Sequence, residues 1–121
     1  MFVEKLRGGL NLTNYARNIV AIFETTLERG QTIPPHYHPD AEELYYILTG
    51  KGLMHIENEN REVEIGDVVY IPLNKVHFLQ NTSSAQVRFI TLTVNAYKVE
   101  PMPPATMVAS WFSINCIRCI I

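Results

Sequence analysis

Three histidines and one glutamate have the residue types and the spacing to hold a metal ion. His36 and His38 are two residues apart, and Glu43 follows five residues after His38. Because side chains two apart on a β-strand face the same way, the two imidazoles are expected to project together. Pro39–Asp40 predicts a turn after them. Glu43 is then expected on the strand that follows this turn and pairs with the segment of the two histidines.

The third imidazole, that of His77, opens a separate strand-like run over residues 77–81. Three imidazoles and one carboxylate near strand ends suit one divalent transition metal, and they leave positions open for water or substrate. An open position is typical of a catalytic metal site. The residue types admit Fe, Mn, Ni, Co, Cu or Zn and do not choose among them.

Two glycine-led stretches carry these four residues at regular intervals. The first, GQTIPPHYHPDAEELYYILTG, runs from Gly30 to Gly50, and the second, GDVVYIPLNKVHFLQN, runs from Gly66 to Asn81. Together they resemble the two signature motifs of the cupin superfamily. The first stretch matches at every fixed position, whereas the second has Asn74 in place of the usual glycine. Because asparagine tolerates positive φ better than other non-glycine residues, we expect the turn before His77 to be kept.

The resemblance implies both a fold and a ligand set. It implies an all-β double-stranded β-helix, the jelly-roll or cupin barrel, followed here by an extra apolar C-terminal segment. It also implies that the metal ligands are His36, His38, Glu43 and His77. Glu42 is the alternative carboxylate, but the six-residue spacing to Gly50 favours Glu43 and predicts that Glu42 faces away.

The strand pattern independently predicts a sandwich or barrel. Short runs of β-branched and aromatic residues alternate with turn residues every 8 to 12 positions. We predict an N-terminal arm or strand over 1–17, a barrel over 18–100, and a Pro-rich linker with an apolar tail over 101–121. Strands are expected at 18–29, 44–48, 53–57, 61–65, 68–71, 76–81 and 86–94.

Four further residues are candidates for the pocket beside the metal. By strand parity Tyr45 shares the Glu43 face, so its hydroxyl is a candidate catalytic or substrate-binding group, with a plain core aromatic as the alternative. Leu79 shares the His77 face in the same way. His55 is a candidate second catalytic residue of undetermined parity. Arg88 is a candidate anion anchor, although its face is ambiguous.

Composition sets limits on partners and location. The chain has 121 residues, 47% of them hydrophobic and 18% charged, with a formal net charge of −2. This predicts one packed domain and gives no basic run for nucleic acid or a membrane surface. The N-terminus lacks the apolar segment of a secretory signal, so we expect a cytoplasmic protein. A lone pair, Cys116 and Cys119, is weak evidence for zinc or redox chemistry.

These observations favour a metal-dependent enzyme that acts on a small organic molecule. Within that class the family resemblance favours a dioxygenase-type oxidoreductase over an isomerase or lyase. The alternative is a non-catalytic barrel that binds a metal or ligand, because a fold alone does not fix a function. We also expect a homodimer, since small cupins often dimerise and the tail over 105–121, which serves as an extra strand or a dimer contact, needs cover.

Overall fold

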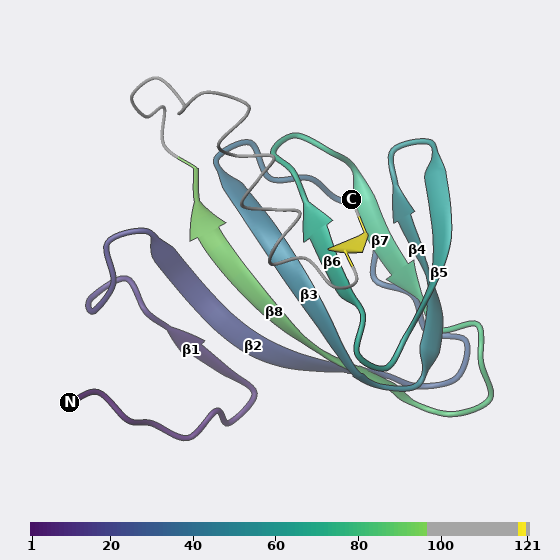
Figure 1. Cartoon of the computed structure of the whole chain (residues 1–121), viewed down its shortest axis with the longest axis horizontal. Coiled ribbons are helices and arrows are strands. Elements are labelled where there is room, and N and C mark those ends of the chain that lie inside the picture. Colours follow the sequence, from purple (N-terminus) through teal and green to yellow (C-terminus); the bar gives the residue numbers. More distant parts are fainter. Residues whose placement is uncertain (97–118, 121) are drawn as a thin grey trace.

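In a computed structural model of the chain, which describes residues 1–96 and 119–120, the strands form two sheets (Figure 1). The large sheet has the strand order β1-β2-β8-β3-β6-β9, and the small sheet has the order β5-β4-β7. The bounds are β1 Gly9–Asn11, β2 Ile19–Leu27, β3 Ala41–Thr49, β4 Lys51–Ile56, β5 Glu59–Glu64, β6 Val68–Ile71, β7 His77–Gln80, β8 Val87–Asn95 and β9 Cys119–Ile120. Every named pair is antiparallel except β6 with β9.

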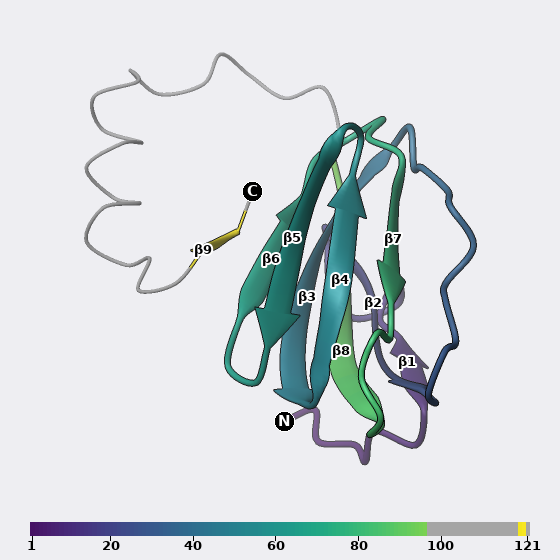
Figure 2. The same ribbon diagram turned by 90° about the vertical axis from the view of Figure 1, so that its right-hand side faces the viewer.

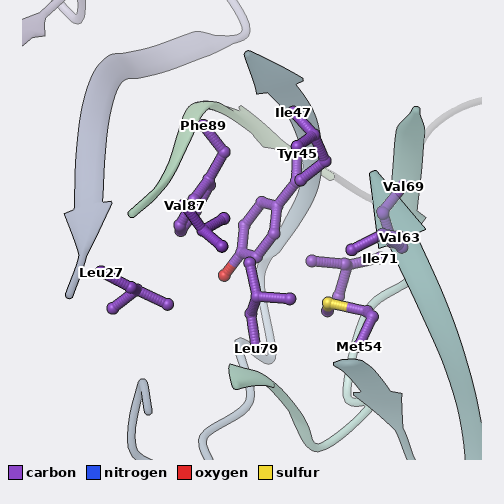
Figure 3. Close-up of a cluster of buried hydrophobic side chains, with 10 residues drawn as sticks. All are labelled: Leu27, Tyr45, Ile47, Met54, Val63, Val69, Ile71, Leu79, Val87 and Phe89. Carbon is purple, nitrogen blue, oxygen red and sulfur yellow. The ribbon is translucent and has the colours of Figure 1, made fainter. Parts of the chain in front are cut away.

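The two sheets face each other and enclose the core between them (Figures 1 and 2). Along β3 the burial alternates strictly from Ala41 to Ile47, as expected for a strand with one face in the core. Figure 3 shows the core side chains, which come from both sheets. They are Leu27, Tyr45, Ile47, Met54, Val63, Val69, Ile71, Leu79, Val87 and Phe89.

Glycines close two of the turns where the backbone needs positive φ. Gly50, between β3 and β4, has φ 85°, and Gly66, before β6, has φ 87°. The two sites differ in space. A Cβ at Gly50 would lie 2.3 Å from the carbonyl oxygen of Gln86, whereas a Cβ at Gly66 would meet no heavy atom within 4 Å. Gly50 is therefore required by packing as well as by conformation.

The all-β double-stranded barrel predicted from the sequence is confirmed. β3 is longer than predicted because Ala41–Glu43 also pairs with β8. The segment between β2 and β3 is no named strand, but it runs beside β7 through bridges at Thr32 and His36. The described part of the chain contains no helix that could cross a membrane.

The predicted division into arm, barrel and tail stays a prediction. The arm contributes β1, which pairs with β2. At the other end Cys119–Ile120 forms β9, whose backbone pairs in parallel with Val68 and Val69 of β6. The remainder of the predicted linker and tail, including Cys116, lies outside the described residues.

Candidate metal centre and adjoining cavity

The four predicted ligands come together from two separate parts of the sequence. One nitrogen or oxygen from each of His36, His38, Glu43 and His77 lies within 4.8 Å of all the others. Both His38 Nε2 and His77 Nε2 lie 3.2 Å from the same carboxylate oxygen, Glu43 Oε1. Glu43 and His77 are buried, with 4% and 1% of their surface exposed, whereas His36 and His38 are half-buried. The group is therefore open on the side of His36 and His38.

Backbone pairing fixes the two histidine segments against each other. His36 and His77 exchange both backbone hydrogen bonds: His36 N–H donates to His77 O at 3.2 Å, and His77 N–H donates to His36 O at 2.9 Å. The N–H of Asn74 donates to His38 O at 2.9 Å. Asn74 has φ 61°, so the expectation that asparagine keeps this turn is confirmed.

Asn74 allows a direct test of this turn. We expect Asn74→Gly to leave the free energy of unfolding within about 0.5 kcal/mol, because glycine accepts positive φ. Asn74→Ala is expected to cost about 1 kcal/mol, because alanine gains nothing locally to offset the left-handed conformation. Urea unfolding of both variants measures the difference. Equal stability of the two variants would contradict this account of the turn.

Hydrogen bonds to backbone carbonyls fix the tautomers of two histidines. His36 Nδ1 lies 2.8 Å from Pro34 O, and His77 Nδ1 lies 2.8 Å from Lys75 O. A carbonyl only accepts, so each Nδ1 carries the proton, and each neutral ring presents the Nε2 lone pair. Such a hydrogen bond, donated by the ring nitrogen that does not face the metal, is expected for metal-binding histidines.

The tautomer of His77 creates a conflict at Glu43 that a cation resolves. With the proton on Nδ1, neutral His77 turns an Nε2 lone pair toward Glu43 Oε1, which itself only accepts. Two acceptors 3.2 Å apart require either a second proton on the ring or a positive ion between them. The donor set of three imidazoles and a carboxylate thus fits a divalent transition metal.

The Glu43 carboxylate is stabilised in its ionised form. Burial is the largest influence and would raise its pKa, but the combined interactions with neighbouring groups outweigh it. These are the contacts of Glu43 with His77 and Thr93 and the positive charge that His38 and His77 carry when protonated, and together they lower the pKa below the usual 4.5. Thr93 Oγ1 donates to Glu43 Oε2 at 2.9 Å.

A pH dependence of stability follows for the metal-free protein. Because the folded pKa of Glu43 is lowered, its contribution is fully present above the unfolded value of about 4.5 and is lost as the pH falls through the folded pKa. We expect the difference in unfolding free energy between wild type and Glu43→Gln to shrink steadily below pH 4.5. Urea unfolding at several pH values, with a chelator present, measures it. A difference that stays constant down to pH 3 would show that Glu43 does not titrate this way.

A cavity of about 440 Å³ adjoins the candidate metal ligands and is walled mainly by apolar side chains. Its walls come from β2, β3, β8 and the segment before β3. They include Val20, Ala21, Phe23, Ile33, Tyr45 and Phe89, together with His36, His38 and Glu43. The volume is within the range of small-molecule sites. The candidate ligands thus open onto a space between the large sheet and the segment before β3.

The other four predicted site residues divide into two groups. Tyr45 lines the cavity at 3% exposure, with its ring 4.8 Å from that of Phe89. Burial, and then the negative charge of Glu43, raise the pKa of Tyr45 well above its usual 10. Leu79 is fully buried and belongs to the core (Figure 3).

The structure does not bring His55 or Arg88 to the cavity. His55 stacks on Phe78 at 4.1 Å, and its Nε2 lies 3.0 Å from Gln80 Oε1. Met54, its neighbour on β4, is buried in the core, so His55 is on the opposite face of the small sheet. Arg88 forms an ion pair with Glu24. Both side chains face away from the cavity.

Glu42 also faces away, as predicted. It accepts a hydrogen bond of 2.5 Å from the hydroxyl of Tyr70 on β6. Burial and this contact with Glu42 raise the pKa of Tyr70 to about 12. The two adjacent glutamates therefore have separate roles, one inside the barrel and one outside.

Two threonines of β8 were missed by the sequence argument. Thr93 holds Glu43, and Thr91 lines the cavity. Both lie an even number of residues from Phe89 on β8, so strand parity places all three on one face. The signal was present in the alternation of β8, because the buried Phe89 places that whole set inside the barrel.

Comparison with known families agrees with this geometry. The sequence model of the Cupin_2 family, described as "Cupin domain", matches residues 23–94, which is more than half of the chain. The chain belongs to the cupin family. Residues 23–94 run from β2 to β8 and contain all four candidate ligands of this cupin.

Individual relatives match over part of their length. An uncharacterised protein of Methanocaldococcus jannaschii is 38% identical over 80 residues, which is 66% of this cupin and 64% of the relative. A protein of Thermotoga maritima named "Oxalate-binding protein" is 28% identical over 68 residues, 56% of each chain. This cupin thus spans less than two thirds of the length of either relative.

Solved structures share the fold. A predicted oxalate decarboxylase from Thermotoga maritima superposes with a TM-score of 0.68 at 22% identity, over 78% of this cupin and 90% of that chain. A cupin protein from Bacteroides fragilis gives a TM-score of 0.67 at 27% identity, over 85% and 88% of the two chains. The double-stranded β-helix is therefore the shared architecture.

Proposed function

We propose that this cupin is a metal-dependent enzyme that acts on a small organic molecule as a dioxygenase-type oxidoreductase. The observation that carries the proposal is the pair of ring nitrogens, His38 Nε2 and His77 Nε2, directed at one carboxylate oxygen of Glu43. The other ring nitrogen of His77, Nδ1, already donates a hydrogen bond to the carbonyl of Lys75. A divalent ion held by the four side chains would supply Lewis-acid polarisation of an oxygen or activation of dioxygen.

The remaining residues contribute binding and exclusion of water. The apolar walls favour a small molecule with an apolar body, and the half-buried side of His36 and His38 gives access. Thr93 keeps the Glu43 carboxylate in place through its hydrogen bond to Oε2. These contacts would preorganise the ligand set before an ion arrives.

The scarcity of proton-transfer groups supports oxidation over isomerisation or elimination. Among the described residues that line the cavity, the titratable ones are Tyr45 and the ligands themselves. The pKa of Tyr45 is raised, so its phenol is a poor general base near neutral pH. An isomerase or lyase would need such a base, whereas oxygen chemistry at a metal does not depend on one.

A binding module without turnover is the second candidate. The relative named "Oxalate-binding protein" supports it, since that name describes binding alone. A metal would be held by the same four residues in both cases. The cytoplasmic location and the homodimer stay predictions.

Elemental analysis of protein purified without a histidine tag tests the proposal. We expect about one equivalent of Fe, Mn, Ni, Co, Cu or Zn in the wild type and its loss in the double variant His36→Ala/His38→Ala. Oxygen-uptake assays with small phenols, diketones and thiols then separate turnover from binding. Absence of metal from both proteins after reconstitution would refute the metal site, and bound metal without any oxygen uptake would favour the binding module.

A further inference from the structure

The charges of the side chains around the cavity limit which molecules it can bind. None of the described residues that line it is lysine or arginine. Arg88, the residue predicted as an anion anchor, is engaged by Glu24 on the outer face of the large sheet. A ligand with two negative charges would therefore enter a largely apolar space in which no described lining residue is an arginine or lysine that could pair with it.

Charge balance at the ligand set selects a singly charged molecule. Three neutral imidazoles and the Glu43 carboxylate carry a total charge of −1, so a divalent ion brings the site to +1. One negative charge on the ligand neutralises this, and a second would be left uncompensated in the cavity. Uncompensated charge in apolar surroundings is costly.

Thr91 supplies a polar group that the fold itself does not use. It is 1% exposed, and its Oγ1 is buried without a hydrogen-bond partner in the described part of the chain. On β8 it is paired in register with Tyr45 on one side and Phe23 on the other, and all three line the cavity. Thr93, two residues further along the same face, is already committed to Glu43. A buried hydroxyl without a partner is unfavourable, so a ligand oxygen near Thr91 would be stabilising.

We infer that the cavity takes a singly charged small molecule with an apolar body and two oxygens, one for the ion and one that Thr91 hydrogen-bonds, so that Thr91 sets specificity. This inference rests on the proposed metal site and deepens it. It separates this cupin from an oxalate binder, because oxalate carries two charges and has no apolar body. The enolate of a β-diketone has the inferred character.

The test uses the full chain loaded with cobalt(II), whose visible spectrum reports ligand binding without redox chemistry. Pentane-2,4-dione and oxalate are titrated separately, and each Kd is compared with that for aqueous cobalt(II) in the same buffer. We expect the protein to favour the dione over oxalate by at least about tenfold on this scale, a difference of about 1.4 kcal/mol. Cobalt content is measured in every sample.

Three variants assign the role of Thr91. Thr91→Val is expected to raise the Kd for the dione about tenfold while leaving cobalt content unchanged and the unfolding midpoint unchanged or higher, since it removes an unsatisfied hydroxyl. Thr91→Ser retains a hydroxyl and should keep the Kd within about threefold. The control Thr26→Val makes the same change at an exposed position of β2 and should have no effect.

The outcomes distinguish this inference from the function on which it rests. A wild type that holds no cobalt would remove the metal site and the inference together. Cobalt retained with a preference for oxalate, or with a dione Kd that Thr91→Val does not change, would overturn the inference alone. A preference for the dione that Thr91→Val abolishes and Thr91→Ser preserves would support it.

Discussion

Glu43→Gln is expected to lower the affinity of this cupin for a divalent transition metal by more than about a hundredfold. Loss of an outer hydrogen-bond partner of a metal ligand typically costs 10- to 100-fold, and loss of the carboxylate among the four candidate ligands should cost more. Glutamine preserves the shape of the side chain but removes the negative charge that balances the ion. Competition with a chromophoric chelator at pH 7.5 measures the change.

Glu42→Gln is the matched control. It makes the same chemical change at the next residue, whose side chain accepts a hydrogen bond from Tyr70 outside the barrel. Its metal affinity should stay within about twofold of wild type, as for a surface change away from the site. If both variants lost metal equally, the assignment of Glu43 as the carboxylate ligand would have to be abandoned.

Gly50→Ala is expected to destabilise the fold by about 3–5 kcal/mol, a large fraction of the stability of a small domain. Two effects add at this position. Alanine at φ 85° is strained, and its Cβ would lie 2.3 Å from Gln86 O and 3.0 Å from Val87 Cα. Both contacts are to backbone at the start of β8, so the strand itself would have to shift. Urea unfolding measures the loss.

Gly66→Ala separates the two effects. Gly66 has almost the same φ, but a Cβ there would meet no heavy atom within 4 Å. The conformational cost alone should be about 1–2 kcal/mol. The difference between the two variants then measures the steric contribution at Gly50, and equal losses would show that no such contribution exists.

Part of the candidate ligand set and most of the strands were predictable from local pattern. His36, His38 and Glu43 lie within eight consecutive residues, so one turn between two extended segments is enough to bring them together. The six-residue spacing to Gly50 favoured Glu43 over Glu42, and the burial along β3 agrees, with Glu43 on the inner face and Glu42 on the other. His77 is distant in sequence, and its position in the group came from the family motif, as did the jelly-roll topology.

The cavity was harder to predict because its walls come from strands that are remote in sequence. Thr91 meets Phe23 and Tyr45 only through the pairing of β8 with β2 and β3, which no single stretch of sequence encodes. The face of Arg88 was ambiguous for the same reason. Its partner Glu24 lies 64 residues away on β2. Parity along β8 alone therefore did not decide which face of the sheet carries the Arg88 side chain.

The ligand set joins the two sheets, and this links metal occupancy to motion of the barrel. Glu43 belongs to β3 of the large sheet and His77 to β7 of the small sheet. His36 is paired with His77 through two backbone hydrogen bonds. An ion bound by all three side chains would cross-link the two sheets and restrain their relative motion. Amide hydrogen exchange at His36 and His77 should then slow markedly on metal loading, making these two protons a reporter of occupancy in any assay condition.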